Sequence, residues 1–263
     1  KIGYQHVEVT AGGKMIRELN NSLPVPGKSI ALTIDAKLQK LVENSFENRK
    51  GGLVAIEPST GEILAFVSMP NFDPNAFIDG IDQKIWEELN TSPDKPLLNR
   101  PLKGLYPPGS TYKPFMALAA LSSGAKDPTE FINDPGYFVL GNHKFRDSSQ
   151  GGHGQVDMKK SIVVSSDTYY YKLAIGMGVD LIHEYISPFG FGKQTGVDLT
   201  GEARGILPSS SWKLQRHGKQ WLQGETPSIG IGQGYNTFTI LQMAKATSII
   251  ANRGVMIKPR LFK

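Results

Sequence analysis

The stretch LYPPGSTYKPFMALAALSSG, residues 105–124, holds the most informative arrangement of residues in this 263-residue chain. Two prolines and a glycine at 107–109 are a turn signal, and mostly apolar residues follow as far as Gly124. This pattern predicts a turn and then a buried helix over residues 110–123 that ends at Gly124. Ser110 and Lys113 stand three positions apart at the start of that helix, so their side chains are expected on one face.

A lysine in the first turn of a buried helix is unfavourably placed for a positive charge. The helix dipole disfavours a cation at this end, and burial removes its water. Both effects favour the neutral amine, and a neutral amine beside a serine hydroxyl is a base beside a nucleophile. The local alternative is a capping Ser110 with a Lys113 whose ammonium reaches solvent. The spacing alone decides nothing, because Ser-x-x-Lys occurs four times, at Ser92, Ser110, Ser123 and Ser210.

A second informative stretch is KSIVVSSDTYYYKLA, residues 160–174. Ser165 and Asp167 lie in it between two helical patterns, at about 158–164 and 168–175. A loop between helices can bring a hydroxyl and an acceptor to a lysine across a cleft. The alternative is that Ser165, Ser166 and Asp167 only cap a helix.

The remaining patterns predict an α+β fold. Residues 1–31 read as short strands and turns, and an amphipathic helix is expected from Asp35 to about Gly51. A hairpin is expected over 53–68, and residues 125–155 are expected to be rich in loops. Further helices are expected near 82–90, 179–187 and 238–251, and a strand begins in VMIKPRLF, residues 255–262.

Composition narrows the classes of function. The net charge is +5, but basic and acidic residues are interleaved, so nucleic acid is not expected as a partner, while a mild preference for an anionic partner stays open. The chain has no cysteine, which excludes disulfides and thiol catalysis. It opens without a secretory signal, so a segment of a longer protein is expected.

Two smaller groups of residues have the composition of possible ligand sites. Asp134, Asp147 and His153, with Asp157 nearby, could hold a metal ion, but a solvated loop histidine is the commoner case, so no metal is predicted. The glycine-rich GIGQG at 230–234 has Tyr235 where the dinucleotide-binding pattern needs glycine, so no nucleotide is predicted there.

Several longer stretches share a resemblance with the two motifs. They are GGLVAIEPSTGEILAFVSMPNFDPNAF, NRPLKGLYPPGSTYKPF, SSDTYYYKLAIGMGVD, FGFGKQTGVDLTGE and IGIGQGYNTFTILQMAKA. Together they resemble the serine acyl-transferases that react with penicillin, and within them the class B penicillin-binding proteins of the elongation type.

The resemblance implies a β-lactamase/transpeptidase-like fold, an antiparallel sheet flanked by helices with a helical subdomain. Residues 1–31 resemble the end of the pedestal or dimerisation-type region of these proteins. Residues 32–263 resemble their transpeptidase domain, whose C-terminal strands are expected beyond Lys263.

The resemblance also implies roles for four residues. Ser110 corresponds to the acylated nucleophile and Lys113 to its base. Ser165 corresponds to the residue that passes a proton to the leaving amine and toward Lys113. Asp167, where many relatives have asparagine, is expected to hydrogen-bond Lys113 and the substrate backbone. The N–H of Ser110 is expected to supply half of an oxyanion hole, so Ser110, Ser165 and Asp167 are also substrate-binding candidates.

Two positions depart from the family pattern. No Lys-Thr-Gly or Lys-Ser-Gly exists in the chain, and GKQTG at 192–196 has Gln194 in place of the lysine. Some elongation-type relatives carry cysteine at the middle of the second motif, beside an Asp/His cluster like Asp134, Asp147 and His153. This chain has Ser166 at that position, which weakens the case for zinc.

The activity implied by the resemblance is a periplasmic peptidoglycan D,D-transpeptidase that needs no organic cofactor. Its expected partners are peptidoglycan stem peptides, β-lactams and a membrane-embedded RodA-type glycosyltransferase. Its expected location is the periplasmic face of the inner membrane, held by an N-terminal helix outside this sequence. The alternatives are a D,D-carboxypeptidase or β-lactamase, a non-catalytic scaffold of the elongation complex, and a cytoplasmic ligand-binding module.

Overall fold

A computed structural model describes residues 2–78 and 80–263 and divides the chain into two compact units. The smaller unit comprises Lys1–Leu32 with Phe262–Lys263. Its strands β1 (Tyr4–Val9) and β2 (Met15–Ser22) form an antiparallel hairpin with two irregularities of register. None of its described residues is buried, so this unit has no hydrophobic core of its own. The assignment of residues 1–31 to a pedestal region stays a prediction.

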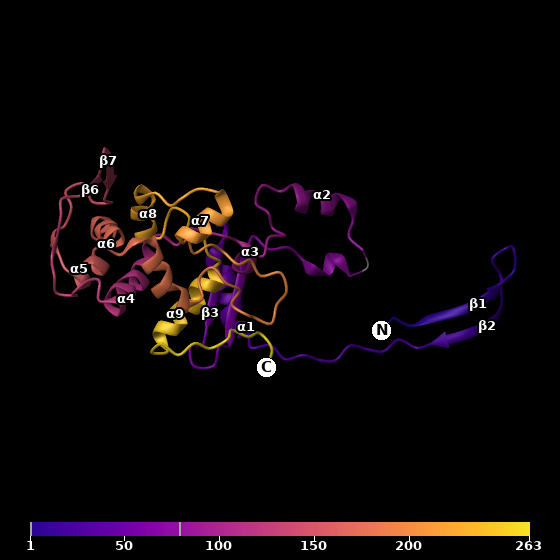
Figure 1. Cartoon of the computed structure of the whole chain (residues 1–263). Helices are drawn as coiled ribbons and strands as arrows, with labels where there is room; N and C mark the ends of the chain where they lie inside the picture. Colours follow the sequence, from indigo (N-terminus) through magenta and orange to yellow (C-terminus); the bar gives the residue numbers. More distant parts are fainter. Residues whose placement is uncertain (1, 79) are drawn as a thin grey trace. The chain divides into compact units, whose positions relative to one another are not determined.

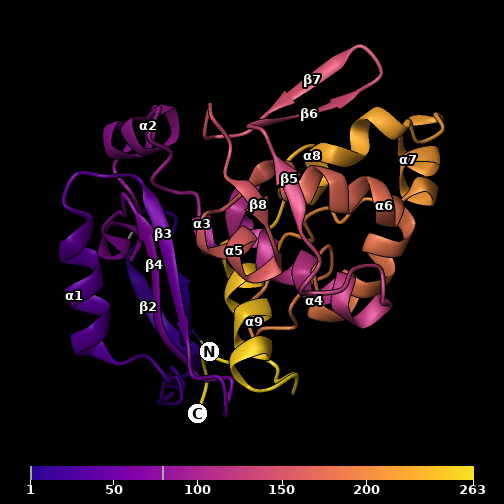
Figure 2. The ribbon, with the colours of Figure 1, turned by 90° about the vertical axis from the view of Figure 1, so that its left-hand side faces the viewer.

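The larger unit, Thr33–Leu261, contains a hairpin of β3 (Gly51–Ile56) and β4 (Ile63–Met69). Helix α1 (Ala36–Phe46) covers one face of this hairpin and α9 (Ile240–Ala251) the other (Figure 2). The strand side chains that point to the core are fully buried: Ile63, Ala65 and Val67. The predicted hairpin and both predicted helices are therefore confirmed, with Asp35 accepting hydrogen bonds at the start of α1 as expected.

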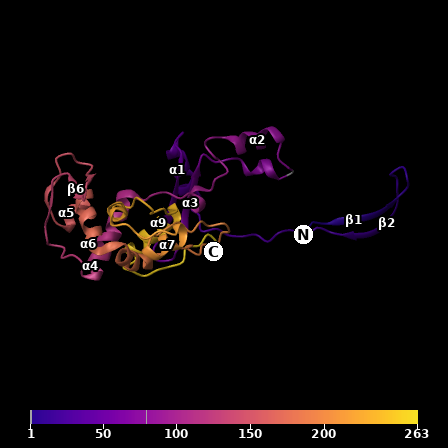
Figure 3. The same ribbon diagram turned by 45° about the horizontal axis from the view of Figure 1, so that its top comes forward.

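A segment between β4 and the helical region projects away from helices α4, α5 and α6 (Figures 1 and 3). It contains the short 3₁₀ helix η1 (Pro74–Phe77) and α2 (Gln83–Thr91). The chain then returns through α3 (Arg100–Lys103), which is buried against the β3–β4 hairpin and α9. Asp82 caps α2, so the helix predicted near 82–90 is confirmed.

The helical region is built on the two stretches that the sequence singled out. The 3₁₀ helix η2 (Gly109–Tyr112) leads into α4 (Lys113–Ser123), and Gly124 ends α4 in the left-handed conformation, with φ 70°. The helix predicted over 110–123 is confirmed, with a first turn that is 3₁₀ rather than α. Helix α5 (Met158–Val163) precedes the long α6 (Asp167–Ile186). Gly178 interrupts α6 with a non-helical backbone, between the two helices predicted there.

Two helices and a 3₁₀ turn were not expected from the sequence pattern. They are α7 (Ser210–His217), η4 (Gln223–Glu225) and α8 (Thr226–Gly230), and the 3₁₀ helix η3 (Ser187–Phe189) follows α6. Helix α8 is five residues long and contains both proline and glycine, so no helical periodicity is visible in it. Close packing on α6 fixes α8 instead, since a Cβ at Gly230 would lie 2.5 Å from the carbonyl oxygen of Tyr170.

Residues 125–155 are loop-rich, as predicted, but they also contain four short strands that were not expected. Strands β5 (Ile132–Asp134) and β8 (Gly154–Val156) pair with each other, and so do β6 (Tyr137–Leu140) and β7 (His143–Arg146). Strands of three or four residues are too short to show an alternating pattern. The strand predicted over 255–262 is wrong, because this stretch has only isolated bridges, including one between Arg260 and Glu62.

An aromatic cluster at the start of α4 anchors the core of the helical region. The ring of Tyr112 lies within 6.4 Å, centroid to centroid, of three rings, those of Phe115, Phe191 and Phe238. This packing fixes η2 and the start of α4, which carry the candidate nucleophile and the candidate base respectively. In the part of the chain that the structure describes, no helix is long and apolar enough to cross a membrane.

Candidate active site

Lys113 is the centre of the candidate site. Its Nζ donates hydrogen bonds to the hydroxyl of Ser165 (3.0 Å), to the carbonyl oxygen of Ser165 (2.6 Å) and to Oδ1 of Asp167 (2.6 Å). The lysine side chain is 2% exposed and that of Asp167 18%. The structure thus brings together three of the four residues that the sequence selected, from segments 52 and 54 positions apart.

The carboxylate of Asp167 is the charged partner of Lys113. Its Oδ1 lies 2.6 Å from Nζ, in an ion pair whose lysine side chain is almost completely shielded from solvent. Lys113 is therefore held in position by the second motif, through this ion pair and through its hydrogen bonds to Ser165.

Ser110 lies one 3₁₀ turn before Lys113 and is exposed. In a 3₁₀ turn, side chains at i and i+3 are nearly eclipsed, which keeps Ser110 on the side of Lys113. Within the described residues, no hydrogen bond joins the two side chains. The nucleophile candidate is thus open to an incoming molecule, while its base candidate is buried and held by the second motif.

The turn that carries Ser110 is held in place by a backbone contact between two glycines. Gly109 has φ 57°, and its N–H donates to the carbonyl oxygen of Gly232 (3.0 Å). A Cβ at Gly232 would lie 2.4 Å from the carbonyl oxygen of Gly109, so only glycine allows this approach. The GIGQG stretch therefore supports the nucleophile turn. This role was not predicted from the sequence, because the glycines were compared only with a nucleotide-binding pattern.

The loop of the second motif has an unusual backbone. Ser165 has φ 55°, a left-handed conformation that is strained for a serine. The next residue, Ser166, caps α6, because its hydroxyl accepts the N–H of Tyr169 (3.1 Å). The hydrogen bond from Lys113 to the Ser165 carbonyl and this cap hold the strained loop from both sides.

Behind this loop lies the cluster of Asp134, Asp147, His153 and Ser166. Asp134 accepts a hydrogen bond from the Ser166 hydroxyl (2.8 Å) and lies 2.8 Å from Nδ1 of His153. Burial by itself would raise the pKa of Asp134, but hydrogen bonds from His153, the Gly136 N–H and Ser166 outweigh it and hold that pKa below its usual value.

The ligand atoms of Asp134, Asp147 and His153 lie within 4.8 Å of one another. A structural zinc site closes four ligands around the ion, drawn from thiolates, imidazoles and carboxylates. Three residues here are of those kinds, and the fourth member, Ser166, offers a neutral hydroxyl that is already bonded to Asp134. The donor set therefore does not make up a closed zinc site, and that no metal binds stays a prediction.

The same cluster positions Asp167. The carboxylate of Asp147 accepts the N–H of Thr168 at 2.7 Å, one residue after Asp167. Ser166, one residue before it, is fully buried against Asp134. Asp167 is thus fixed through its two chain neighbours, and hydrogen bonds supply the support that a metal ion could otherwise give.

The GKQTG stretch at 192–196 has a structural role. The carboxylate of Glu202 accepts the N–H groups of Thr195 (2.7 Å) and Gly196 (3.3 Å). Gln194 donates to the carbonyl oxygen of Glu202 at 2.9 Å. These hydrogen bonds close a turn. Among the described residues, none of them connects this stretch to Lys113 or to Asp167.

A Ser-x-x-Lys turn that faces a Ser-x-Asp loop, beside a helix-covered hairpin, defines the class of serine acyl-transferases that react with penicillin. Residues 51–263 match the family model of the penicillin binding protein transpeptidase domain, and the chain belongs to this family. The resemblance and the fold class drawn from the sequence are thereby confirmed.

Curated relatives carry the name peptidoglycan D,D-transpeptidase MrdA. The Acinetobacter baumannii protein is 45% identical over 99% of this chain, and the Escherichia coli K12 protein is 42% identical over 98%. The alignments cover 39% and 41% of those two proteins, so the chain spans about two fifths of their length.

Solved structures of penicillin-binding protein 2 are similar to this chain. Pseudomonas aeruginosa PBP2 in complex with WCK 5153 superposes with a TM-score of 0.88 and 48% identity, over 91% of this chain and 53% of that one. The PBP2 of Helicobacter pylori in complex with MreC gives a TM-score of 0.87 and 35% identity, over 99% of this chain and 49% of that one.

Proposed function

We propose that this chain is the catalytic part of a peptidoglycan D,D-transpeptidase that works through a serine acyl-enzyme. The observation that carries the proposal is the buried Lys113, which is hydrogen-bonded to Ser165 and Asp167 and lies one turn after the exposed Ser110. The family and the MrdA relatives support the same chemistry.

In the first half-reaction, Oγ of Ser110 attacks the carbonyl carbon between the two D-alanines of a stem peptide. The Ser110 proton passes to Nζ of Lys113, which acts as the base. Ser165, 3.0 Å from Nζ, relays a proton to the nitrogen of the leaving D-alanine. The C–N bond breaks as the C–O bond to Ser110 stays, which leaves an acyl-enzyme.

In the second half-reaction, an amine of a neighbouring stem peptide attacks the acyl carbon. A new C–N bond forms, the bond to Ser110 breaks, and the amine proton returns through Lys113 to the serine hydroxyl. A β-lactam ring would acylate Ser110 by the first step and block the second. None of these steps requires an organic cofactor.

The cellular setting belongs to the same proposal. We place the protein at the periplasmic face of the inner membrane, beside a RodA-type glycosyltransferase. A structure titled as a peptidoglycan synthase complex that coordinates polymerization and crosslinking supports this, with a TM-score of 0.84 and 32% identity over 99% of this chain.

The test is the intact mass of the protein after incubation with benzylpenicillin. We expect an adduct of one drug molecule on the wild type and none on Ser110→Ala. Two forms are compared: residues 1–263, and a chain extended past Lys263 by the matching segment of the Acinetobacter baumannii relative. An adduct in either form excludes the scaffold alternative, and turnover of a chromogenic β-lactam would indicate the β-lactamase alternative. Absence of the adduct from both forms would contradict the proposal.

A further inference from the structure

Three aromatic side chains on the segment that projects between β4 and α3 are only partly covered by the protein. Phe72, Phe77 and Trp86 form this aromatic patch and are 36%, 38% and 41% exposed. The rings of Phe72 and Phe77 lie 5.6 Å apart, and those of Phe77 and Trp86 6.5 Å apart, both edge to face. Large apolar side chains that are packed together and still face solvent are typical of interaction sites.

The segment that carries the aromatic patch has no core of its own. None of the described residues between positions 71 and 95 is buried. Asp73 and Asp82 accept backbone N–H groups at the starts of η1 and α2. Local hydrogen bonds and the contacts between the rings therefore shape this segment, and its apolar side chains stay accessible.

A pocket of about 480 Å³ opens beside the aromatic patch. Its lining residues are Phe77, Ile81, Gln83 and Trp86. A hollow of this size is in the range that receives organic groups. The patch and the pocket together form one surface that apolar side chains of another molecule can fill.

Acidic residues alternate with the residues of this surface along the chain. Residues 71–99 carry six acidic and two basic side chains, in a chain whose net charge is +5. Glu87 accepts a hydrogen bond from Gln83 (3.2 Å), which lines the pocket. Within the described residues, Asp73, Asp82 and Glu87 form no ion pair. The surface therefore combines exposed rings with negative charge that the protein does not neutralise.

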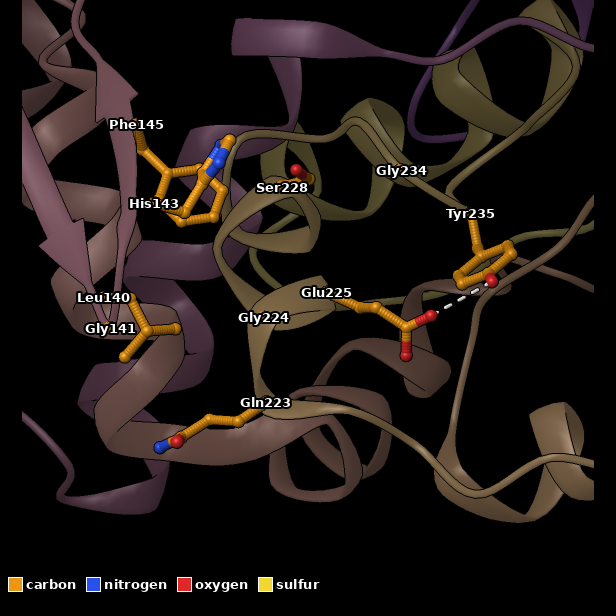
Figure 4. Close-up of a pocket in the computed structure, with 10 residues that line it drawn as sticks. All are labelled: Leu140, Gly141, His143, Phe145, Gln223, Gly224, Glu225, Ser228, Gly234 and Tyr235. Atoms are coloured by element: carbon orange, nitrogen blue, oxygen red, sulfur yellow. Dashed lines mark hydrogen bonds between the residues drawn. The ribbon is translucent and has the colours of Figure 1, made fainter.

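The pocket shown in Figure 4, between the β6–β7 hairpin and residues 223–235, has the opposite electrostatics. Both oxygens of its Glu225 accept hydrogen bonds from Lys213 (2.6 and 2.5 Å), and the Tyr235 hydroxyl donates to Oε1 at 3.1 Å. That carboxylate is neutralised from within the protein. The carboxylates beside the aromatic patch are left to attract a positively charged partner.

Charge and secondary structure decide which partner fits the aromatic patch. The acidic side chains repel an anionic lipid surface. The described part of 71–99 consists of helices and loops, so it offers no strand edge to which an extended peptide could add. An amphipathic helix presents apolar side chains three and four residues apart on one face, which suits a groove lined by aromatic residues.

From these observations we infer that the aromatic patch and its pocket bind an amphipathic helix of another protein, with an apolar face bordered by lysine or arginine. The apolar face fills the pocket and covers the three rings. The basic side chains pair with acidic residues such as Glu87. This inference is separate from the proposed function, because it involves none of the residues assigned to catalysis.

The first test locates the binding site by nuclear magnetic resonance. Residues 1–263, labelled with ¹⁵N at the tryptophan indoles, are titrated with a short synthetic helix that has leucine on one face and lysine on the other. The chain has three tryptophans, Trp86, Trp212 and Trp221, so each indole N–H reports on its own surroundings. We expect the signal of Trp86 to shift and the other two to stay. The same helix with glutamate in place of lysine should bind about tenfold more weakly.

The second test changes the rings and the charge separately. Trp86→Ala should weaken binding of the leucine–lysine helix about tenfold or more, because it removes the central aromatic contact. Glu87→Lys should weaken it about fivefold and strengthen binding of the leucine–glutamate helix. The matched controls are Leu41→Ala, at an exposed apolar residue of α1, and Glu184→Lys, at an exposed glutamate of α6. Both controls should bind as the wild type does.

The outcomes distinguish this partner from the alternatives. Shifts at Trp212 or Trp221 in place of Trp86, or an unchanged affinity of Trp86→Ala, would overturn the assignment. Sedimentation with phosphatidylglycerol vesicles that Trp86→Ala abolishes would assign the patch to a membrane instead. Self-association that Trp86→Ala abolishes would assign it to a second copy of this chain, and either result would overturn the inference.

The same variant keeps this inference apart from the proposed function. Acylation of Ser110 by benzylpenicillin should be unchanged in Trp86→Ala, in whichever form of the protein is acylated. Failure of acylation in the wild type would overturn the transpeptidase proposal and leave the binding of the leucine–lysine helix as it was measured.

Discussion

At the scale of single residues, the contact between Lys113 and Asp167 is an ion pair that also holds the Lys113 side chain in position. The ammonium is nearly fully buried and hydrogen-bonds both Ser165 and Asp167. Removing one member of a buried pair leaves the other uncompensated, which commonly costs about 3–5 kcal/mol. The site therefore depends on an acceptor at position 167 for stability as well as for the proposed proton transfer.

Asp167→Asn should keep most of the acylation activity, and Asp167→Ala should not. The asparagine oxygen can still accept the hydrogen bond from Lys113, so we expect acylation by benzylpenicillin within about tenfold of the wild type. The alanine variant loses the acceptor and should be slower by about a hundredfold. Stopped-flow acylation rates distinguish the two variants, and equal rates for both would contradict a positioning role for Asp167.

The residues that sequence could identify are those that carry a local signature. Ser110, Lys113, Ser165 and Asp167 sit in short motifs whose residue types suggest chemistry. Gly232 carries no such signature, because its importance lies in a backbone contact with a glycine 123 positions earlier. Non-local contacts of this kind are invisible to any pattern within a window of residues.

At the scale of elements, a largely buried ion pair joins α7 to the 3₁₀ helix η4. Lys213 on α7 donates to both oxygens of Glu225, which also accepts the N–H of Leu222 (2.9 Å). In the sequence, Lys213 stands out only as the lysine of one of the four Ser-x-x-Lys motifs. Its partner lies 12 residues away in a segment without periodicity, so the pair could not be predicted.

Glu225→Gln should destabilise the protein in a pH-dependent way. Burial alone would raise the pKa of Glu225, but hydrogen bonds from Lys213, the Leu222 N–H and Tyr235 outweigh it and hold that pKa below its ordinary 4.5. A lowered pKa means that the carboxylate stabilises the fold above pH 4.5 and loses this effect as the pH falls through the folded-state pKa.

We therefore expect Glu225→Gln to lower the free energy of unfolding by about 2–3 kcal/mol at pH 7, and by much less near pH 3. Denaturant titrations at both pH values measure this difference. Glu88→Gln is the control, since Glu88 is exposed and forms no ion pair among the described residues. A loss that stays constant with pH would contradict the electrostatic explanation.

At the scale of the whole molecule, the two units differ in how they are stabilised. Both hydrophobic clusters consist of residues of the larger unit, while the smaller unit is an exposed two-stranded hairpin. An isolated hairpin of this size is at best marginally stable in water. Its exposed apolar side chains include Ile2, Met15, Ile16 and Leu19.

Residues 33–261 alone should therefore fold cooperatively. We expect the Tm of this shortened chain to lie within about 3 °C of that of residues 1–263, because no buried residue is lost. Thermal unfolding followed by circular dichroism compares the two. A broad transition, or a Tm lower by ten degrees, would show that the hairpin contributes to the core.

The contact between Gly109 and Gly232 has a consequence for how this gene can vary. The contact is made by backbone atoms, so no series of small side-chain changes can adjust it step by step. Any other residue at 232 brings a Cβ to 2.4 Å from a carbonyl oxygen. Under the proposed function, selection by β-lactams should therefore favour changes in side chains around this contact, such as the exposed Gln233, and leave Gly232 unchanged.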